Sequence, residues 1–375
     1  MIYLDNAATT KPDGECLKAA EKYLYDEFYN PSALYKGGYG LQCEIKKTRE
    51  SILSLIADTE NFGLIFTSCG SEADNQAIFC GGKRGNIVTT AGEHSAVFSA
   101  VSELKLRGFE VRIAAINGDG SVNEESLLNL VDDKTSLVSV IHVNNETGAV
   151  NDIARLSRLV KARNKFTLFH SDGVQAFGKI PFKITRDIDM YSVSAHKIGG
   201  IKGVGALIKC KNLVIKPYVY GGGQESGLRS GTENVFGIKN FGFAAVKRYS
   251  AIKENYEKAS ILHELLWQNL DKSLFKKISG ENCSPYILCV SAERLRGETI
   301  LHEADDAGLI IGTGSACSSN EKKRFSRTIL ACGVGESTAE GVLRLSLSPE
   351  NTREEIISAA EILNKIVANR KNIMA

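Results

Sequence analysis

Short apolar runs alternate with longer amphipathic stretches along the first half of the chain. The apolar runs are rich in β-branched residues, which predicts strands at 63–68, 86–90, 136–143, 166–172 and 189–195. Three of the amphipathic stretches have apolar side chains at helical spacing, which predicts helices that begin near residue 71 and span 94–107 and 152–164. This β-α-β-α order is typical of a mostly parallel sheet with helices on both faces.

The pattern changes after the glycine-rich stretch 221–232. A long helical pattern follows, and beyond Pro285 strands and helices alternate again until a final helix that begins near Thr352. We therefore predict a large domain over 1–245 and a smaller α/β domain over 246–375. The first 15 to 30 residues, approximately, are equally able to pack with the small domain.

Composition excludes several classes of function. The net charge of +2, from 46 basic and 44 acidic side chains, gives no bulk attraction to nucleic acid or to an anionic membrane. We also expect no membrane span, since no uncharged apolar run approaches the roughly 18 residues that one needs. The N-terminus lacks a basic region followed by an apolar stretch, so we expect no signal peptide and a cytoplasmic protein.

The nine cysteines argue for a reducing compartment. Their number is odd and no CxxC pair occurs, so neither a disulfide framework nor a zinc site is expected. One thiol has unusual neighbours. Cys317 lies in GTGSACSSN (312–320), among glycines and serines that favour an exposed loop, whereas a free cysteine is usually buried.

Two motif matches are rejected. GVQAFGKI (173–180) fits G-x-x-x-x-G-K, but Ile180 stands where a phosphate-binding loop needs Ser or Thr, and Pro181 follows. HELLW (263–267) lacks the second histidine of a zinc-protease motif, and the chain has no G-x-G-x-x-G to indicate a dinucleotide fold.

Polar residues that are suited to catalysis or ligand binding follow several of the predicted strands. In SVSAHKIGG (192–200) a lysine, Lys197, stands at a strand end, where it is suited to form a Schiff base with a carbonyl. An exposed lysine on a turn is the ordinary alternative. SCGSEADN (68–75) enters a helix through glycine, which suits phosphate binding, although Ser71 also fits a plain helix cap with Asp74.

Two further strand ends carry candidates. Asp172 is suited to pair with a pyridinium nitrogen, the contact that makes pyridoxal phosphate an electron sink, and Gln175 would reach a phenolic oxygen. His94 would stack on a flat cofactor. Each residue alone is as easily a cap or a structural side chain. Because ligands of open α/β sheets bind at the carboxyl ends of strands, the coincidence of all of them at one edge favours a shared site.

These stretches resemble the cysteine desulfurases, a group of class V aminotransferases that use pyridoxal phosphate. The resemblance covers essentially the whole chain, in YLDNAATT (3–10), NPSALYKGG (30–38), SAHKIGGIKGVGAL (194–207), GGGQESGLRSGTEN (221–234), GTGSACSS (312–319) and RLSLSPENTREEI (344–356). It implies a fold-type I transferase with a mostly parallel seven-stranded sheet in the large domain and a smaller α/β domain that carries the Cys317 loop.

The resemblance also implies roles for individual residues. Lys197 would be the Schiff-base lysine, Cys317 the nucleophile that takes sulfur from L-cysteine as a persulfide, and His94 a candidate proton acceptor for that thiol. The other contacts to the cofactor would come from His94, Asp172, Gln175, Gly70, Ser71, Ser194 and His196, with Thr232 reaching the phosphate of the partner subunit in a homodimer. Asn145 and Arg344 would bind the substrate carboxylate, which suits the planar fork of an arginine.

The chain departs from the family pattern at the phosphate motif, where Cys69, Gly70 and Ser71 replace Gly, Ala and Thr; all three are small, so phosphate binding should survive. We expect L-alanine and a persulfide as products, acceptor proteins for iron–sulfur assembly or thiolation as partners, and no metal. The alternatives are a selenocysteine lyase, an aminotransferase or racemase of the same fold, and a catalytically silent sulfur carrier that binds partners through the basic segment 321–327.

Overall fold

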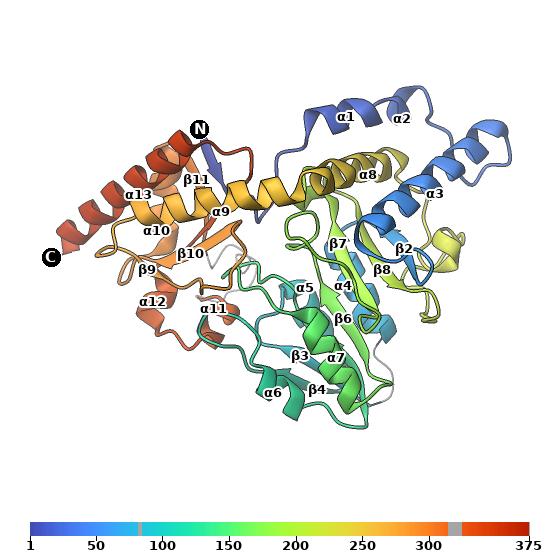
Figure 1. The fold of residues 1–375 in the computed structure, drawn as a ribbon, viewed down its shortest axis with the longest axis horizontal. Helices are drawn as coiled ribbons and strands as arrows, with labels where there is room; N and C mark the ends of the chain where they lie inside the picture. The colour runs from blue at the N-terminus through green and yellow to red at the C-terminus, as the bar shows by residue number, and fades with distance from the viewer. Residues whose placement is uncertain (82–84, 314–324, 375) are drawn as a thin grey trace.

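The computed structural model describes residues 1–81, 85–313 and 325–374, and it contains two β-sheets (Figure 1). The larger has seven strands in the order β2-β8-β7-β6-β5-β3-β4. Their bounds are Phe62–Thr67 (β2), Asn86–Thr90 (β3), Glu110–Ala114 (β4), Thr135–Ser139 (β5), Leu168–Asp172 (β6), Met190–Ser194 (β7) and Gly205–Cys210 (β8). Only β8 runs antiparallel to its neighbours, so the predicted mostly parallel, seven-stranded sheet is confirmed.

Helices cover both faces of this sheet because successive strand residues point to opposite sides. The helices are Lys36–Ile56 (α3), Gly70–Gly81 (α4), Ser95–Leu106 (α5), Glu124–Asn129 (α6), Ile153–Arg163 (α7) and Val235–Ser250 (α8). On β5, Leu137 belongs to the buried apolar cluster that includes residues of α4 and α5, whereas Val138 belongs to the cluster that includes residues of α3, α7 and α8. The predicted helices near 71, 94–107 and 152–164 are thus present as α4, α5 and α7.

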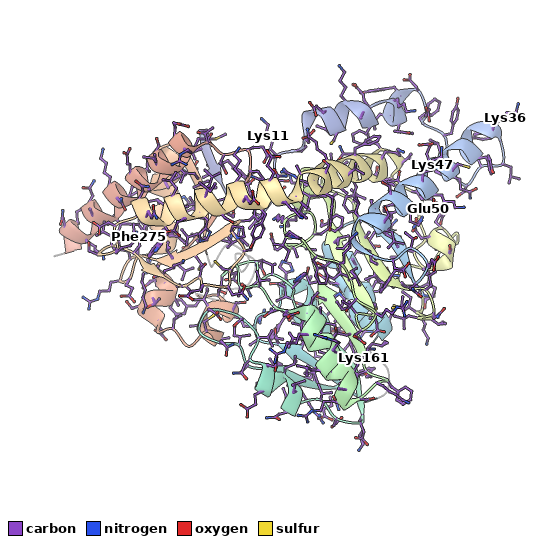
Figure 2. The ribbon with its side chains drawn as sticks, viewed as in Figure 1. Lys11, Lys36, Lys47, Glu50, Lys161 and Phe275 are labelled. Carbon is purple, nitrogen blue, oxygen red and sulfur yellow. The ribbon has the colours of Figure 1, made fainter. Side chains whose placement is uncertain are left out.

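The smaller sheet has five strands in the order β1-β11-β12-β10-β9. Phe275, labelled in Figure 2, is buried in its core beside Leu4 and Leu363. The strands are Ile2–Leu4 (β1), Lys276–Lys277 (β9), Ile287–Ser291 (β10), Leu309–Thr313 (β11) and Val342–Ser346 (β12). The helices of this part are Ile252–Asn269 (α9), Gly297–Asp306 (α10), Arg327–Ala331 (α11), Glu336–Glu340 (α12) and Arg353–Met374 (α13).

The N-terminal strand belongs to the smaller sheet, where β1 pairs in parallel with β11. The following residues cross to the larger sheet, and α1 (Gly14–Ala20) and α2 (Lys22–Tyr25) then lie along α8. Figure 1 shows α8 and α9 running as a long helical path between the two sheets. The predicted boundary near residue 245 falls inside α8, and the division into two domains stays a prediction.

The sequence pattern does not predict two strands of the larger sheet. β4 is an edge strand with charged residues at Glu110 and Arg112, and β8 follows a glycine-rich stretch that has the composition of a loop. Among the described residues no helix has the length and apolar character needed to cross a membrane.

Gly205 begins β8 at a crowded position beside the turn that enters α4. It pairs with Thr67 at the end of β2 and with Ser194 at the end of β7. A Cβ atom at Gly205 would stand 2.6 Å from the carbonyl carbon of Cys69 and 2.8 Å from the carbonyl oxygen of Val193. Since both are backbone atoms, a side chain fits at this position only if the backbone shifts.

We predict that Gly205→Ala lowers the free energy of unfolding by about 1–3 kcal/mol, because the turn at Cys69 has to shift. Gly63→Ala on β2 is the matched control, since its Cβ would meet only Lys211 Cγ at 3.9 Å. This control should be neutral or stabilising by about 0.5–1 kcal/mol, as expected for Gly→Ala in a strand. Urea unfolding of the two variants tests the difference, and equal stabilities would contradict the account.

Candidate active site

A cavity of about 320 Å³ lies at the carboxyl ends of β2, β3, β6 and β7, and Arg344 of β12 reaches it from the smaller sheet. It brings together most of the predicted site residues, namely Gly70, Ser71, His94, Asn145, Asp172, Gln175, Ser194, His196, Lys197 and Arg344. Thr232 is exposed and does not line this cavity. Cys317 lies outside the described residues.

Lys197 ends a short 3₁₀ turn, η1 (Ala195–Lys197), directly after β7. Its Nζ donates to the carbonyl oxygens of Ala7, at 2.6 Å, and Ala8, at 2.8 Å. The same N-terminal segment binds the turn again, because the Thr10 amide and hydroxyl both donate to the carbonyl of His196 at 2.9 Å. The segment after β1 is therefore a wall of the site that positions the lysine.

His94 is the N-cap of α5, and its Nδ1 accepts a hydrogen bond from the Ala96 amide at 3.1 Å. Burial lowers the pKa of His94 to about 4, helped by the positive charges of Lys197, Arg327 and Arg344. The imidazole is therefore neutral at physiological pH. Because Nδ1 accepts, the ring proton is assigned to Nε2.

Two buried carboxyl groups face each other near His94. The Val174 amide donates to Asp172 Oδ1 at 2.9 Å, yet burial raises the pKa of Asp172 to about 6. Asp74 lies close by, since one ligand atom each of Asp74, His94 and Asp172 fall within 4.8 Å of one another. Burial and the charge of Asp172 raise the pKa of Asp74 well above its usual range. A cationic group placed between these carboxyls would be stabilised strongly.

The turn from β2 into α4 has the features of an anion site. The backbone N–H groups at the start of α4 and the helix dipole favour a negative charge there. A Cβ on Gly70 would stand 2.7 Å from Val174 Cγ2, so glycine permits the close approach of the two loops. Ser194 Oγ is buried at the same place and has no hydrogen-bond partner within the described part of the chain. An oxyanion would supply that partner.

Gln175 and Arg344 approach the cavity through well-defined hydrogen bonds. Gln175 Nε2 donates to Ala7 O at 2.8 Å, and its Oε1 accepts from Lys179 Nζ at 2.8 Å. The Arg344 guanidinium donates to the carbonyl oxygen of Asn145 at 3.0 Å and to Asp5 Oδ1 at 2.8 Å. Both side chains are thus held in one orientation before any ligand binds.

Sequence reasoning missed several residues of this site. The sequence indicates only a cap partner at Asp74, but its side chain is buried and lines the cavity. The signal was present, because Asp74 is three residues after Ser71 and so lies on the same helix face. The carbonyls of Ala7 and Ala8 carried no signal, since a backbone oxygen has no sequence signature.

Glu93, next to His94, is a buried acid that titrates far from its usual range. Its Oε1 accepts from the Thr90 hydroxyl at 2.7 Å and from the Ile141 amide at 2.9 Å. Burial nevertheless raises its pKa to about 8. At neutral pH the folded protein therefore keeps a proton on Glu93 that the unfolded chain has released.

We predict that this proton makes folding pH-dependent. The folded state binds the extra proton between the unfolded pKa near 4.5 and the folded pKa near 8, so stability falls as pH rises through that window. In the wild type the free energy of unfolding should fall by up to about 1.4 kcal/mol per pH unit between pH 6 and 8 because of this group. Glu93→Gln should abolish that part of the fall. Urea unfolding at both pH values measures it, with exposed Glu60→Gln as control, and identical pH slopes in wild type and Glu93→Gln would refute it.

Comparisons with known proteins agree with this geometry. Residues 2–358 match the family model described as aminotransferase class-V. A cysteine desulfurase of Trichormus azollae is 35% identical, over 98% of this chain and 93% of its own length. A solved structure of a NifS-like protein superposes with a TM-score of 0.91 at 32% identity, over 98% of this chain and 99% of that one.

A third similar protein has a solved structure in complex with an amino acid. The structure of SspA in complex with cysteine has a TM-score of 0.80 and 28% identity, over 94% of this chain and 100% of that one. The family match and the full-length relatives agree on one assignment. The chain belongs to the class V aminotransferase family and, within it, to the cysteine desulfurases.

Proposed function

We propose that this chain is a pyridoxal-phosphate-dependent enzyme that converts L-cysteine to L-alanine and leaves the sulfur as a persulfide on Cys317. The observation that carries the proposal is the cavity itself. It joins Lys197, Asp172 and His94, from three strand ends of one sheet, with Arg344 from the other sheet. An amine, a buried acid, a flat neutral ring and a carboxylate-binding arginine make up the set that this chemistry needs.

The residues present fit pyridoxal phosphate. The start of α4, the unpartnered Ser194 hydroxyl and the glycine cradle at Gly70 suit its phosphate. Gly70, Ser71, Ser194 and His196 would hold the phosphate, while Lys197, His94, Asp172 and Gln175 would hold the ring. Bound there, the cofactor would supply an electron sink for the α-carbon of an amino acid.

The protein side chains hold protons in positions that favour this chemistry. A pyridinium nitrogen beside Asp172 would favour the ionised carboxylate, which burial otherwise disfavours. Neutral His94 would stack on the ring without adding a positive charge to it. To accept the proton of the Cys317 thiol at Nε2, His94 would have to adopt the other tautomer and give up its hydrogen bond from Ala96.

Arg344 and Asn145 would bind the carboxylate of the substrate. The guanidinium is 4% exposed and is oriented by Asp5, so little side-chain entropy remains to be lost when a carboxylate binds. The Asn145 side chain lies beside it in the same cavity.

Besides the thiol of the substrate, the sulfur transfer would need the thiol of Cys317. The carbon–sulfur bond of the substrate breaks, a sulfur–sulfur bond to Cys317 forms, and a proton replaces sulfur on carbon, so that L-cysteine and a thiol become L-alanine and a persulfide. Acceptor proteins would then remove the sulfur. We also propose a homodimer, in which Thr232 reaches the partner's phosphate, and a cytoplasmic location.

We expect the wild-type protein, incubated with L-cysteine without reductant, to release about one alanine per subunit and to gain one sulfur on Cys317. Cys317→Ala should lose both. Cys43→Ala should lose neither, because Cys43 lies on α3 and does not line the cavity. Amino-acid analysis and peptide mass spectrometry measure the two products. Alanine from Cys317→Ala, or sulfur on another cysteine, would contradict the proposal, and a keto acid in place of alanine would favour an aminotransferase.

A second prediction concerns substrate binding. Arg344→Lys keeps the charge but loses the fork that pairs two bonds with a carboxylate. The KM for L-cysteine should rise about tenfold to a hundredfold, while the affinity for pyridoxal phosphate changes little. Arg112→Lys on β4, where the guanidinium binds Glu110 and Asp132, is the control and should leave KM unchanged. A wild-type KM in Arg344→Lys would rule out the assigned role.

A further inference from the structure

Lys179 belongs to the GVQAFGKI stretch that matched, and failed, the pattern of a phosphate-binding loop. In the structure this stretch forms a helical turn after β6, with the Phe177 amide bonded to Gly173 O and the Ile180 amide bonded to Ala176 O. Lys179 stands four residues after Gln175, so the two side chains lie on the same side of the turn. The lysine therefore has a close neighbour in the candidate site.

The burial of Lys179 calls for a reason. The residue is 6% exposed, and within the described chain no carboxylate lies within 4.0 Å of its Nζ. Burial, together with the charges of Lys197, Arg248 and Arg344, lowers the pKa of its amine well below the usual range. A buried lysine without an acidic partner is costly, and an ordinary core position would be filled by an apolar side chain.

Within the described part of the chain, the Lys179 amine makes one side-chain hydrogen bond, to the amide oxygen of Gln175 at 2.8 Å. The two ends of a glutamine amide have nearly the same shape and opposite hydrogen-bonding character, so the groups around the amide decide which end faces which way. Because the Lys179 amine donates to Oε1, it holds that oxygen on its own side of the amide. Nε2 must then face Ala7 O, to which it donates at 2.8 Å, and the cavity.

We propose that Lys179 is a positioning residue that locks the Gln175 amide with its N–H groups toward the cavity, so that the amide donates to the phenolate oxygen of the bound cofactor. The inference rests on the proposed function. Without Lys179 only the hydrogen bond to Ala7 O opposes a turn of the amide, and a turned amide would present its oxygen, which would repel a phenolate oxygen instead of binding it. Lys179 thus acts on the cofactor only through Gln175.

The test compares holoenzymes of wild type, Lys179→Met, Gln175→Leu and the double variant. Methionine is close to lysine in length and has no N–H. Lys179→Met should raise the dissociation constant for pyridoxal phosphate about three- to tenfold, the value of one hydrogen bond, and should change the visible absorbance of the bound cofactor. In the Gln175→Leu background the same substitution should change neither, since no amide remains to be oriented.

Lys209→Met is the matched control. Lys209 is also largely buried, but its Nζ donates to backbone carbonyls such as Cys210 O and Leu213 O, away from the cavity. Its substitution should leave cofactor affinity and absorbance unchanged whatever it does to stability. If Lys179→Met does not fold, Lys179→Gln replaces it with the same expectation, because an amide at 179 is not an obligate donor.

Two results would overturn the role of Lys179 alone. One is a wild-type absorbance and affinity in Lys179→Met; the other is an equal effect of Lys179→Met with and without Gln175. A wild-type protein that binds no pyridoxal phosphate would overturn the proposed function, and this inference with it.

Discussion

The backbone carbonyl of Ala7 accepts hydrogen bonds from two side chains, and both of them come from strand ends of the larger sheet. Lys197 donates from the end of β7 at 2.6 Å, and Gln175 donates from the turn after β6 at 2.8 Å. Ala7 itself follows β1, which is a strand of the smaller sheet. This carbonyl therefore ties the N-terminal segment to the larger sheet, while Arg344 and Asp5 make a second tie beside it.

Exclusion of water explains the electrostatics around this point. Burial keeps His94 neutral at physiological pH and raises the pKa of Asp172 and Asp74, so the two acids oppose an anionic ligand less than exposed carboxylates would. A cavity of this kind attracts a ligand that carries phosphate and carboxylate groups and restores the ionised state of a nearby acid. The same burial makes a fixed amide at Gln175 useful, because an opposed dipole is costly where no water screens it.

The parts that sequence reasoning predicted well are those with a local pattern. Apolar runs located the strands before Asp172 and Lys197, and the rule that ligands bind at strand ends brought the right side chains to one edge. Sequence reasoning failed where a contact that positions a residue comes from a part of the chain remote in sequence. The Ala7 carbonyl that Gln175 binds is 168 residues away, and the first residue of β8, Gly205, pairs with Thr67 and Ser194, which are both remote in sequence. Lys179 matches the lysine of the G-x-x-x-x-G-K motif, but that match gives no indication of its hydrogen bond to Gln175.

The central claim is that Lys197, and not the neighbouring buried Lys179, holds pyridoxal phosphate in this cavity. Borohydride reduction of the protein after incubation with pyridoxal phosphate, followed by peptide mass spectrometry, tests it directly, because the reduced bond survives digestion. The account predicts a phosphopyridoxyl group on Lys197 and an unmodified Lys179. A modified Lys179 with an unmodified Lys197, or no specific modification at all, would contradict it.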